Sequence, residues 1–426
     1  MKFRHAVLLA SVFFVEASIL ARAQGGPPPR QPATLADLLA EAERNNPQIQ
    51  AARHAWDAAK QVPTQVSTLP DPQIAVQHFS VGSPRPFAGY TNSDFAYIGL
   101  GFSQDIPYPG KLRLRGEIAK KDTGVLQERH ESVRRAVLSA VKKTYFQLGY
   151  LSEKAAILNA DRELLRQMEQ SAAARYRSGV GNQQEVLQAQ LEQTKLLREI
   201  TMIQLEAGQL QAAIKQILNR SQSSPDIETA SLSETPLAHT YEQLLAAVSA
   251  NNPELAGMQR MVERQKLQVD LAKKDFYPDF NLQYMWQRTN PTQFRAYYML
   301  TLGVRVPIYR GRRQQPELAQ AEAEQNRAKS EYEAQTQQIA FQLRQQFLSA
   351  EKSAELLKIY REGLIPQARA ELQAGLAAYQ SNRQDFQALL ASFLDVLKLD
   401  EEYWHTLSEH EMALARIEEL TGLSPR

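Results

Sequence analysis

Few side chains in this sequence have the types and spacing that catalysis or metal binding requires. His405 and His410 are five residues apart with no third ligand nearby, so we expect them to face solvent rather than to bind a metal ion. Met258 and Met261 could attract a soft metal ion, but on a helix such a pair more often packs against neighbours. No phosphate-binding loop or dinucleotide fingerprint is present. We therefore predict no catalytic residues, no cofactor and no resident metal, and we do not expect an enzyme.

The composition excludes further classes of site. The 426 residues include no cysteine. This absence excludes disulfides, thiolate metal ligands, cysteine nucleophiles and a lipid-modified N-terminal cysteine. The formal net charge is +2 at pH 7, so the sequence indicates no electrostatic preference for nucleic acid.

Six basic residues follow two strand-like segments. One interpretation is an interfacial collar, in which long basic side chains reach lipid headgroups. The alternative is an ordinary charged helix start, although basic charge at a helix N-terminus opposes the helix dipole. The six residues are Lys111, Arg113, Arg115, Arg310, Arg312 and Arg313.

The N-terminal segment has the pattern of a secretory signal, predicted at residues 1–23. A basic start precedes an apolar stretch, Ala6–Val15, that is too short to span a bilayer, and Ala21-Arg22-Ala23 fits a cleavage site. Residues 24–33 are rich in proline and should form a disordered lead-in. No later run reaches about 18 apolar residues, so the sequence predicts no transmembrane helix.

The chain contains an internal repeat whose landmarks recur in the same order. Chance matches would not keep this order along the chain, so we infer a duplication. The matches are Asn45–Ile49 with Asn251–Leu255, Ile106-Pro107-Tyr108 with Val306-Pro307-Ile308, and Tyr176-Arg177-Ser178 with Tyr379-Gln380-Ser381.

Each repeat has the same predicted order of elements. A helix comes first, at Leu35–Val66 and at Tyr241–Lys274, and a proline ends it. A β-hairpin follows, at 72–106 and at 278–306, and then a pair of long helices. The predicted divisions are a first repeat at 34–225, a linker at 226–239 and a second repeat at 240–426.

The hairpin segments alternate between apolar and polar residues, which predicts a sheet with one apolar face. Polar residues such as Asn281, Gln283 and Thr301 fall on the opposite face. Strands of about ten residues suit a membrane barrel, although a half-buried sheet in a soluble domain gives the same alternation. The apolar face of the second hairpin, which would face lipid in a barrel, comprises Phe280, Leu282, Tyr284, Trp286, Leu300 and Leu302.

The helical segments are longer than those of ordinary globular domains. Almost nothing interrupts a helix from Leu112 to Arg177, which at 1.5 Å per residue would be roughly 100 Å long. Apolar residues from Leu196 to Ile217 recur at alternating spacings of four and three, which indicates a coiled-coil seam. A soluble coiled-coil bundle would explain the helices but not the strands or the signal.

Four strands cannot close a barrel, and an open sheet edge in lipid leaves backbone groups unsatisfied. Two chains would give eight strands, whose interior side chains about fill, whereas three would give twelve and a water-filled lumen. We therefore predict a mainly α-helical protein with membrane β-structure: a trimeric twelve-stranded barrel continuous with an α-helical coiled-coil barrel.

The sequence resembles the TolC family of outer-membrane efflux channels over nearly its whole mature length. Asn45-Asn46-Pro47 is similar to a helix start of that family, and Asp71-Pro72-Gln73-Ile74 to its entry into a strand. Tyr108-Pro109-Gly110-Lys111-Leu112 and Asp385-Phe386 are most similar to the branch that works with heavy-metal pumps of the RND type.

The resemblance implies a passive conduit in a tripartite efflux system of a Gram-negative bacterium. It implies a homotrimer in the cell outer membrane that contacts lipid there and extends into the periplasm. The partners would be a periplasmic adaptor and an inner-membrane pump, with heavy-metal ions as one cargo. The alternative from another class is a periplasmic coiled-coil adaptor or scaffold, but an adaptor normally has one helical hairpin, whereas this sequence has two.

The turns between the paired long helices are the expected adaptor-docking tips. Glycine and asparagine there permit left-handed backbone, so we expect positive φ at Gly179 and Gly181. The predicted tip residues are Ser178, Gly179, Gly181, Ser381 and Asn382.

Acidic residues line the periplasmic aperture in some family members, but those positions fall on Ala388 and Ala391 here. Glu185 and Asp385 are the nearby candidate aperture acids. A solvated helix face is the preferred explanation of both, so the sequence does not fix the chemistry of the gate.

Overall fold

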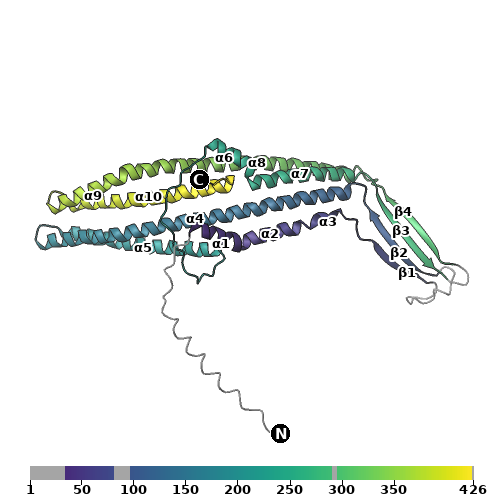
Figure 1. Cartoon of the computed structure of the whole chain (residues 1–426), viewed down its shortest axis with the longest axis horizontal. Helices are drawn as coiled ribbons and strands as arrows, with labels where there is room; N and C mark the ends of the chain where they lie inside the picture. The colour runs from purple at the N-terminus through teal and green to yellow at the C-terminus, as the bar shows by residue number, and fades with distance from the viewer. Residues whose placement is uncertain (1–33, 81–95, 290–294, 425–426) are drawn as a thin grey trace, which may run out of the picture.

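The computed structural model describes residues 34–80, 96–289 and 295–424. The predicted signal and lead-in, and most of the two loops that join the strands of each hairpin, lie outside these residues. The long helices run side by side along the molecule, with the sheet at one end and the helix turns at the other (Figure 1). The prediction of a mainly helical chain with four strands is confirmed.

The first half of the chain departs from the prediction of a single helix at Leu35–Val66. Three helices occupy this segment: α1 (Leu35–Asn45), α2 (Pro47–Ala59) and α3 (Val62–Ser67). Asn46 has extended backbone, with φ −67° and ψ 123°. Pro47 is the cause, because a proline lacks an N–H group and pushes the preceding residue out of the helical region.

The second half repeats this break. The predicted helix Tyr241–Lys274 is divided into α6 (Tyr241–Asn251) and α7 (Pro253–Lys274), with Asn252 extended at φ −74° and ψ 117°. The prediction of one continuous helix was therefore wrong in both halves. In each case the Asn-Pro pair carries the signal that ends one helix and starts the next.

Each of these asparagines joins two helix ends. The Asn46 side chain accepts hydrogen bonds from the N–H groups of Gln48 and Ile49 at 2.8 and 3.2 Å, and donates to the carbonyl oxygen of Ile217 at 2.8 Å. Ile217 is the last residue of α5 (Gln183–Ile217). One side chain thus satisfies orphan groups at the start of α2 and the end of α5.

Asn252 makes the matching contacts in the second half. It accepts a hydrogen bond from the N–H of Leu255 at 3.1 Å and donates to the carbonyl oxygen of Leu420 at 2.9 Å. Leu420 lies in the last turn of α10 (Phe386–Thr421). A returning helix and a first helix therefore meet end to end in both halves, through the same residue type and the same pair of bonds.

The long outgoing helices reach from the sheet to the turns. Helix α4 (Lys111–Arg177) has 67 residues, which confirms the predicted long helix and gives a length of roughly 100 Å. In the second half α8 (Gln314–Ile359) continues through a π-helical turn, η1 (Tyr360–Leu364), into α9 (Ile365–Gln380). The π-turn directly precedes Pro366, whose missing N–H cannot complete a regular α-helical ladder.

The four strands form one antiparallel sheet in the order β1-β2-β3-β4. Strands β1 (Gln73–Phe79) and β2 (Tyr97–Ile106) form the first hairpin, and β3 (Asp279–Arg288) and β4 (Tyr297–Arg305) form the second. Strand β2 pairs with β3, with Ile106 opposite Phe280. The hairpins of the two halves are thus joined in one sheet, and β1 and β4 are its edges.

The core lies between the two pairs of long helices. Leu158 and Leu165 of α4, Ile203 of α5, and Phe386 and Phe393 of α10 belong to one buried cluster. The predicted seam is confirmed, because Leu196, Ile203 and Ile214 are buried and the seam residues between them are partly buried. The helix pairs therefore form one packed bundle rather than two separate hairpins.

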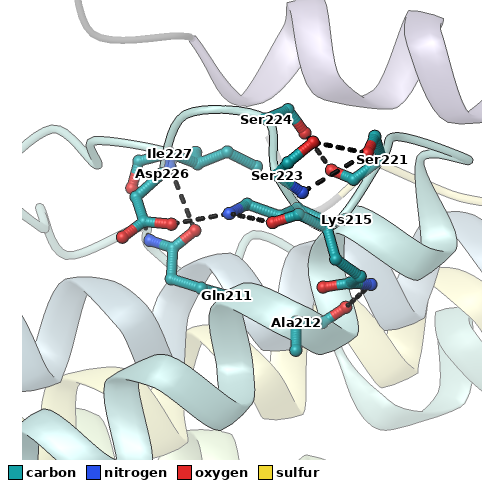
Figure 2. Close-up of polar contacts among 9 residues, drawn as sticks. Gln211, Ala212, Lys215, Ser221, Ser223, Ser224, Asp226 and Ile227 are labelled. Carbon is teal, nitrogen blue, oxygen red and sulfur yellow. Dashed lines mark hydrogen bonds and ion pairs between the residues drawn. The ribbon is translucent and has the colours of Figure 1, made fainter.

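The segment after α5 folds back on that helix (Figure 2). Lys215 forms an ion pair with Asp226 at 2.7 Å. Gln211 both donates to and accepts from the backbone of Ile227, at 2.8 and 3.0 Å. Further on, the N–H of Thr235 donates to Glu411 of α10 at 2.6 Å. The predicted linker 226–239 therefore runs across the helices as a bound strap.

None of the helices in the described ranges is long and apolar enough to cross a membrane.

The asparagine bridges give a first test of the fold. Replacing Asn46 or Asn252 with alanine should lower the free energy of unfolding by about 1–2 kcal/mol, because each change removes an N-cap. Asn46→Asp should cost at least as much, because aspartate keeps the cap but puts a buried carboxylate oxygen against the carbonyl oxygen of Ile217. Urea unfolding followed by circular dichroism would measure the difference. The exposed neighbour Asn45 provides the matched control, and an Asn45→Ala cost equal to that of Asn46→Ala would contradict the bridge.

Candidate functional site

One face of the sheet is apolar, and no part of the described chain covers it. Ile74 at the β1 edge is 74% exposed and Leu302 on β4 is 67% exposed. Apolar residues align in rows across the strands, as in the row Val76, Leu100, Trp286 and Tyr298. The exposed apolar residues of this face are Ile74, Val76, Leu100, Phe102, Tyr284, Trp286, Tyr298, Leu300, Leu302 and Val304.

The opposite face of the sheet carries mostly polar and small residues, together with Met285, Met299 and Tyr297. Asn281 donates to Ser103 and Asp105 on the neighbouring strand, at 3.2 and 2.8 Å. A Cβ added at Gly101 would lie 3.0 Å from Cε of Met285, so the Met285 side chain packs directly on this glycine of β2. The sheet therefore separates an apolar surface from one that is mainly polar.

The six residues predicted to face lipid all lie on the apolar face. Leu282 is opposite Leu302, and Tyr284 is opposite Leu300. Tyr284, Trp286, Leu300 and Leu302 are exposed, whereas Phe280 and Leu282 are partly buried near the helical end of the strands. Alternation along the sequence shows which residues of one strand share a face. The pairing of β3 with β4 adds which residues of the two strands are neighbours on that face.

The two helix turns at the far end have matching backbone geometry. Gly179 has φ 76° and Asn382 has φ 58°, both in the left-handed region. Gly181 does not have a positive φ, so that expectation was wrong. Its reason for being glycine is space: an added Cβ would lie 3.0 Å from both Cβ of Arg175 and the backbone nitrogen of Tyr176. Ser178 and Ser381 bind carbonyl groups of the preceding helical turn.

Tyr379 connects the two tips. Its hydroxyl donates to Glu185 at 2.9 Å, and its backbone oxygen accepts a hydrogen bond from Arg175 at 2.8 Å. The Arg175 guanidinium also lies over the tyrosine ring, 4.4 Å from its centre. Burial raises the pKa of Tyr379, and the hydrogen bond to Glu185 raises it further. Two helices of the first half thus hold one side chain of the second.

Both candidate aperture acids have partners within the chain. Glu185 accepts the hydrogen bond from Tyr379. Asp385 caps α10 by accepting from the N–H of Ala388 at 2.8 Å. Each carboxylate therefore takes part in the local structure of a tip.

Charged side chains also lie between the helix pairs. Lys154 of α4 contacts Glu199 of α5 at 2.9 Å and Glu401 of α10. Burial lowers the pKa of Lys154, but its hydrogen bonds to the two glutamates outweigh burial and raise it overall. Burial and nearby Asp400 raise the pKa of Asp161 to about 6. Because the folded chain holds this proton more tightly, Asp161 removes stability as the pH rises from the ordinary aspartate range through 6.

The candidate metal ligands do not converge. No group of three or more His, Asp or Glu side chains suited to a metal ion occurs in the described part of the chain. His410 was expected to face solvent but is fully buried, with Nδ1 3.0 Å from Ser353 and Nε2 2.8 Å from the carbonyl oxygen of Thr235. It therefore fixes the linker strap to α8 and α10. Met258 and Met261 are partly buried side chains of α7.

The basic residues after the strands do not act as one collar. Lys111 is buried and forms ion pairs of 2.9 Å with both Asp275 and Asp279. The collar interpretation is wrong for this residue, because its charge is neutralised inside the junction of sheet and helices. Arg310 and Arg312, after the other hairpin, are exposed.

The whole fold is similar to solved structures of outer-membrane channels. The outer-membrane channel OprN matches with a TM-score of 0.80 and 17% identity, covering 92% of this chain and 91% of its own. VceC from Vibrio cholerae matches with a TM-score of 0.78 and 16% identity, covering 93% and 100%. CusC, described in connection with transmembrane channel formation, matches at 0.77 and 15%, covering 92% and 95%. No protein with a curated description matches by sequence at a significant level.

A family model described as "Outer membrane efflux protein" matches residues 38–220 and 244–392 of this sequence. The chain belongs to the outer membrane efflux protein family. This family is of the TolC type, so the predicted resemblance is confirmed at that level. The family comprises outer-membrane efflux channels of Gram-negative bacteria that extend into the periplasm, not a class of enzymes. Its channels are trimeric and work in tripartite efflux systems.

Sequence reasoning used Tyr379 only as an alignment landmark and missed its contacts. The available signal was a difference between the repeats. Arg175 and Glu185, which hold Tyr379, correspond to Ala378 and Ala388 in the second half. Arg175 and Glu185 are charged in the first repeat, whereas the second repeat has alanines there. This difference marks the place where the first repeat contacts Tyr379 of the second.

The tip contact gives a second test. Tyr379→Phe should remove about 1 kcal/mol of local stability by deleting the bond to Glu185. Backbone amides of both tips should then exchange with deuterium roughly fivefold faster. Tyr176→Phe is the matched control, because Tyr176 occupies the same position in the first repeat and is 48% exposed. Equal exchange rates in the two variants would show that the hydroxyl does not join the tips.

Proposed function

We propose that three copies of this chain form a passive outer-membrane channel of a tripartite efflux system. The four strands of each copy would close a twelve-stranded barrel, and the helices would form a coiled-coil tunnel in the periplasm. The observation that carries the proposal is the sheet, which has an uncovered apolar face, a mainly polar opposite face and two edge strands. Such a sheet satisfies its backbone in lipid only by closing with further copies.

The helices support the same assembly. Large apolar side chains on α5 and α8 are exposed in the single chain, and exposed apolar stripes at helical spacing favour a partner helix. A further copy on each side would cover them and bury both stripes. They are Leu187, Leu191, Leu197, Met202 and Leu205 on α5, and Phe341, Leu348, Leu356 and Ile359 on α8.

A duplication supports a ring of six similar units. The Asn46 and Asn252 bridges use the same atoms, and the two tips share left-handed residues at Gly179 and Asn382. Three copies would therefore present six similar tips at the end farthest from the sheet. This arrangement suits docking of a ring of periplasmic adaptor subunits, which would connect the channel to an inner-membrane pump.

The pump would be of the RND type and the cargo would include heavy-metal ions. The support for this is the resemblance of Tyr108-Pro109-Gly110-Lys111-Leu112 and Asp385-Phe386 to the metal-associated branch. A passive conduit needs no binding pocket for its cargo, so selection would lie with the pump. Cell fractionation and single-channel conductance of the purified protein test the proposal. Recovery of the mature protein as a soluble periplasmic monomer would favour the adaptor or scaffold class instead.

The two faces of the sheet should differ in their tolerance of charge. Leu300→Arg should destabilise the inserted trimer by about 2–4 kcal/mol if the position lies near the bilayer midplane, because the charge would enter lipid. Thr301→Arg is the matched control, because the adjacent residue points to the polar face. Trimer yield in outer-membrane fractions measures both. Equal yields would overturn the assignment of the lipid face.

The tip glycines should matter for export rather than for assembly. Gly179→Val places a β-branched residue at φ 76°, and Gly181→Val forces atoms against Arg175. Both should reduce export while trimer yield and membrane insertion stay normal, because the sheet lies at the far end. Normal export by both tip variants would remove the docking assignment, and loss of the trimer would indicate a purely structural role.

A further inference from the structure

The two turns that lead from the sheet into the long helices have opposite exposures. The sequence Ile106-Pro107-Tyr108 before α4 matches Val306-Pro307-Ile308 before α8. Tyr108 is partly buried, whereas Ile308 is 73% exposed and Tyr309 is 69% exposed. We call residues 107–111 the closed turn and residues 306–313 the open turn.

The closed turn is covered by the segment that joins α7 to β3, residues 274–279. Tyr108 stacks on Tyr277 with ring centres 4.6 Å apart. The N–H of Tyr108 donates to Asp279 at 2.8 Å. Lys111 then neutralises Asp275 and Asp279. A stacked aromatic pair and the ion pairs of one buried lysine therefore join the two halves of the chain at this junction.

The open turn has the same kinds of groups without a cover. Arg310 and Arg312 are exposed, and neither forms an ion pair with the residues that the structure describes. Arg313 contacts only Glu317 of its own helix, at 3.3 Å, with 73% of its side chain exposed. Apolar and basic side chains thus lie together at this turn, and none of the described residues covers them.

The segment that corresponds to the cover of the closed turn is residues 68–73, between α3 and β1. It aligns with 274–279 through the matched prolines Pro72 and Pro278. Leu69 is 46% exposed, and Asp71 is exposed with no ion pair among the described residues. This segment adjoins β1, whereas the open turn adjoins β4, and these strands are opposite edges of the sheet. Within one chain the two surfaces belong to different sides of the molecule.

We propose that the open turn of one copy packs against residues 68–73 of a second copy, with Arg310 and Arg312 facing Asp71. The inference rests on the proposed trimer and specifies how neighbouring copies meet. The surfaces have opposite charge and matching apolar groups, Leu69 on one side with Ile308 and Tyr309 on the other. A head-to-tail contact of this kind uses different surfaces on each copy and closes a ring by rotation.

The closed turn also supplies a strand register for this contact. Next to it Ile106 of β2 lies opposite Phe280 of β3. Transferring this pairing through the matched residues puts Val306 opposite Ile74 of the second copy, and Arg305 opposite Ala75. The apolar face of each copy then continues into the next, because Ile74 and Val76 meet Val306 and Val304.

Cysteine cross-linking tests the register directly, because the chain contains no cysteine. Directly opposite residues in antiparallel strands have Cα atoms about 4.5–5.5 Å apart, within the range of a disulfide. The pair Ala75→Cys with Arg305→Cys, both on the polar face, should give covalent trimers under mild oxidation. The controls are Gln73→Cys and Gln77→Cys, each combined with Arg305→Cys, which lie two residues out of register. More cross-linking in either control pair than in the Ala75 pair would overturn the inference.

Charge reversal tests the turn contact. Asp71→Arg alone, and Arg310→Glu with Arg312→Glu, should each lower the temperature at which the detergent-solubilised trimer dissociates. Combining all three changes should restore most of the loss, because the opposite charges face each other again. Additive losses would overturn the pairing.

The outcomes separate this inference from the proposed function. If the wild-type protein in detergent is a monomer that forms no trimer in membranes, the proposed channel itself fails. If the wild type is a trimer but the register controls cross-link better, only the turn contact fails. A second measurement tests whether lipid, rather than a second copy, binds at the open turn. If Arg310→Glu with Arg312→Glu weakens the trimer only in vesicles that contain anionic phospholipid, the basic residues bind headgroups and the pairing with Asp71 is wrong.

Discussion

The pairing of β2 with β3 is the contact on which the arrangement of the chain depends. These strands come from different halves of the sequence, so their hydrogen bonds join two hairpins into one sheet. Helix α4 continues from β2, and α7 leads into β3, so the pairing also sets these helices side by side. The Lys111 ion pairs and the Tyr108–Tyr277 stack reinforce the same junction where the strands become helices. From this junction the helices stay side by side along the length of the molecule.

Each half solves the problem of its helix ends in the same way. A returning helix stops partway along the molecule and leaves carbonyl groups without partners, and the first helix begins there with N–H groups without partners. Asn46 and Asn252 each pair with groups from both sets through one side chain. Two helix ends can therefore abut inside a bundle while one side chain bonds to the backbone of both.

The chain does not cover its own surface evenly, although its halves are alike. Tyr379 is held by Arg175 and Glu185, whereas Tyr176, at the matching position, is exposed. At the sheet end one turn is closed and the other is open. In the proposed trimer, further copies would cover the two outer surfaces that a single chain leaves exposed.

The sequence by itself determined the elements and the family type of this protein. Alternation in β3 and β4, the uninterrupted run of α4 and the repeated Asn-Pro landmarks are local patterns, and each is set by backbone geometry within a few residues. Local pattern also held the signal for the helix breaks at Asn46 and Asn252, although the prediction overlooked it. Tertiary structure alone decided the partners of single side chains. Lys111 is an internal ion-pair residue, His410 fixes a strap, and Gly181 relieves crowding rather than adopting a positive φ. These roles depend on residues that are far away in the sequence and that packing brings within a few ångströms. The spacing of residues along the chain does not predict such contacts.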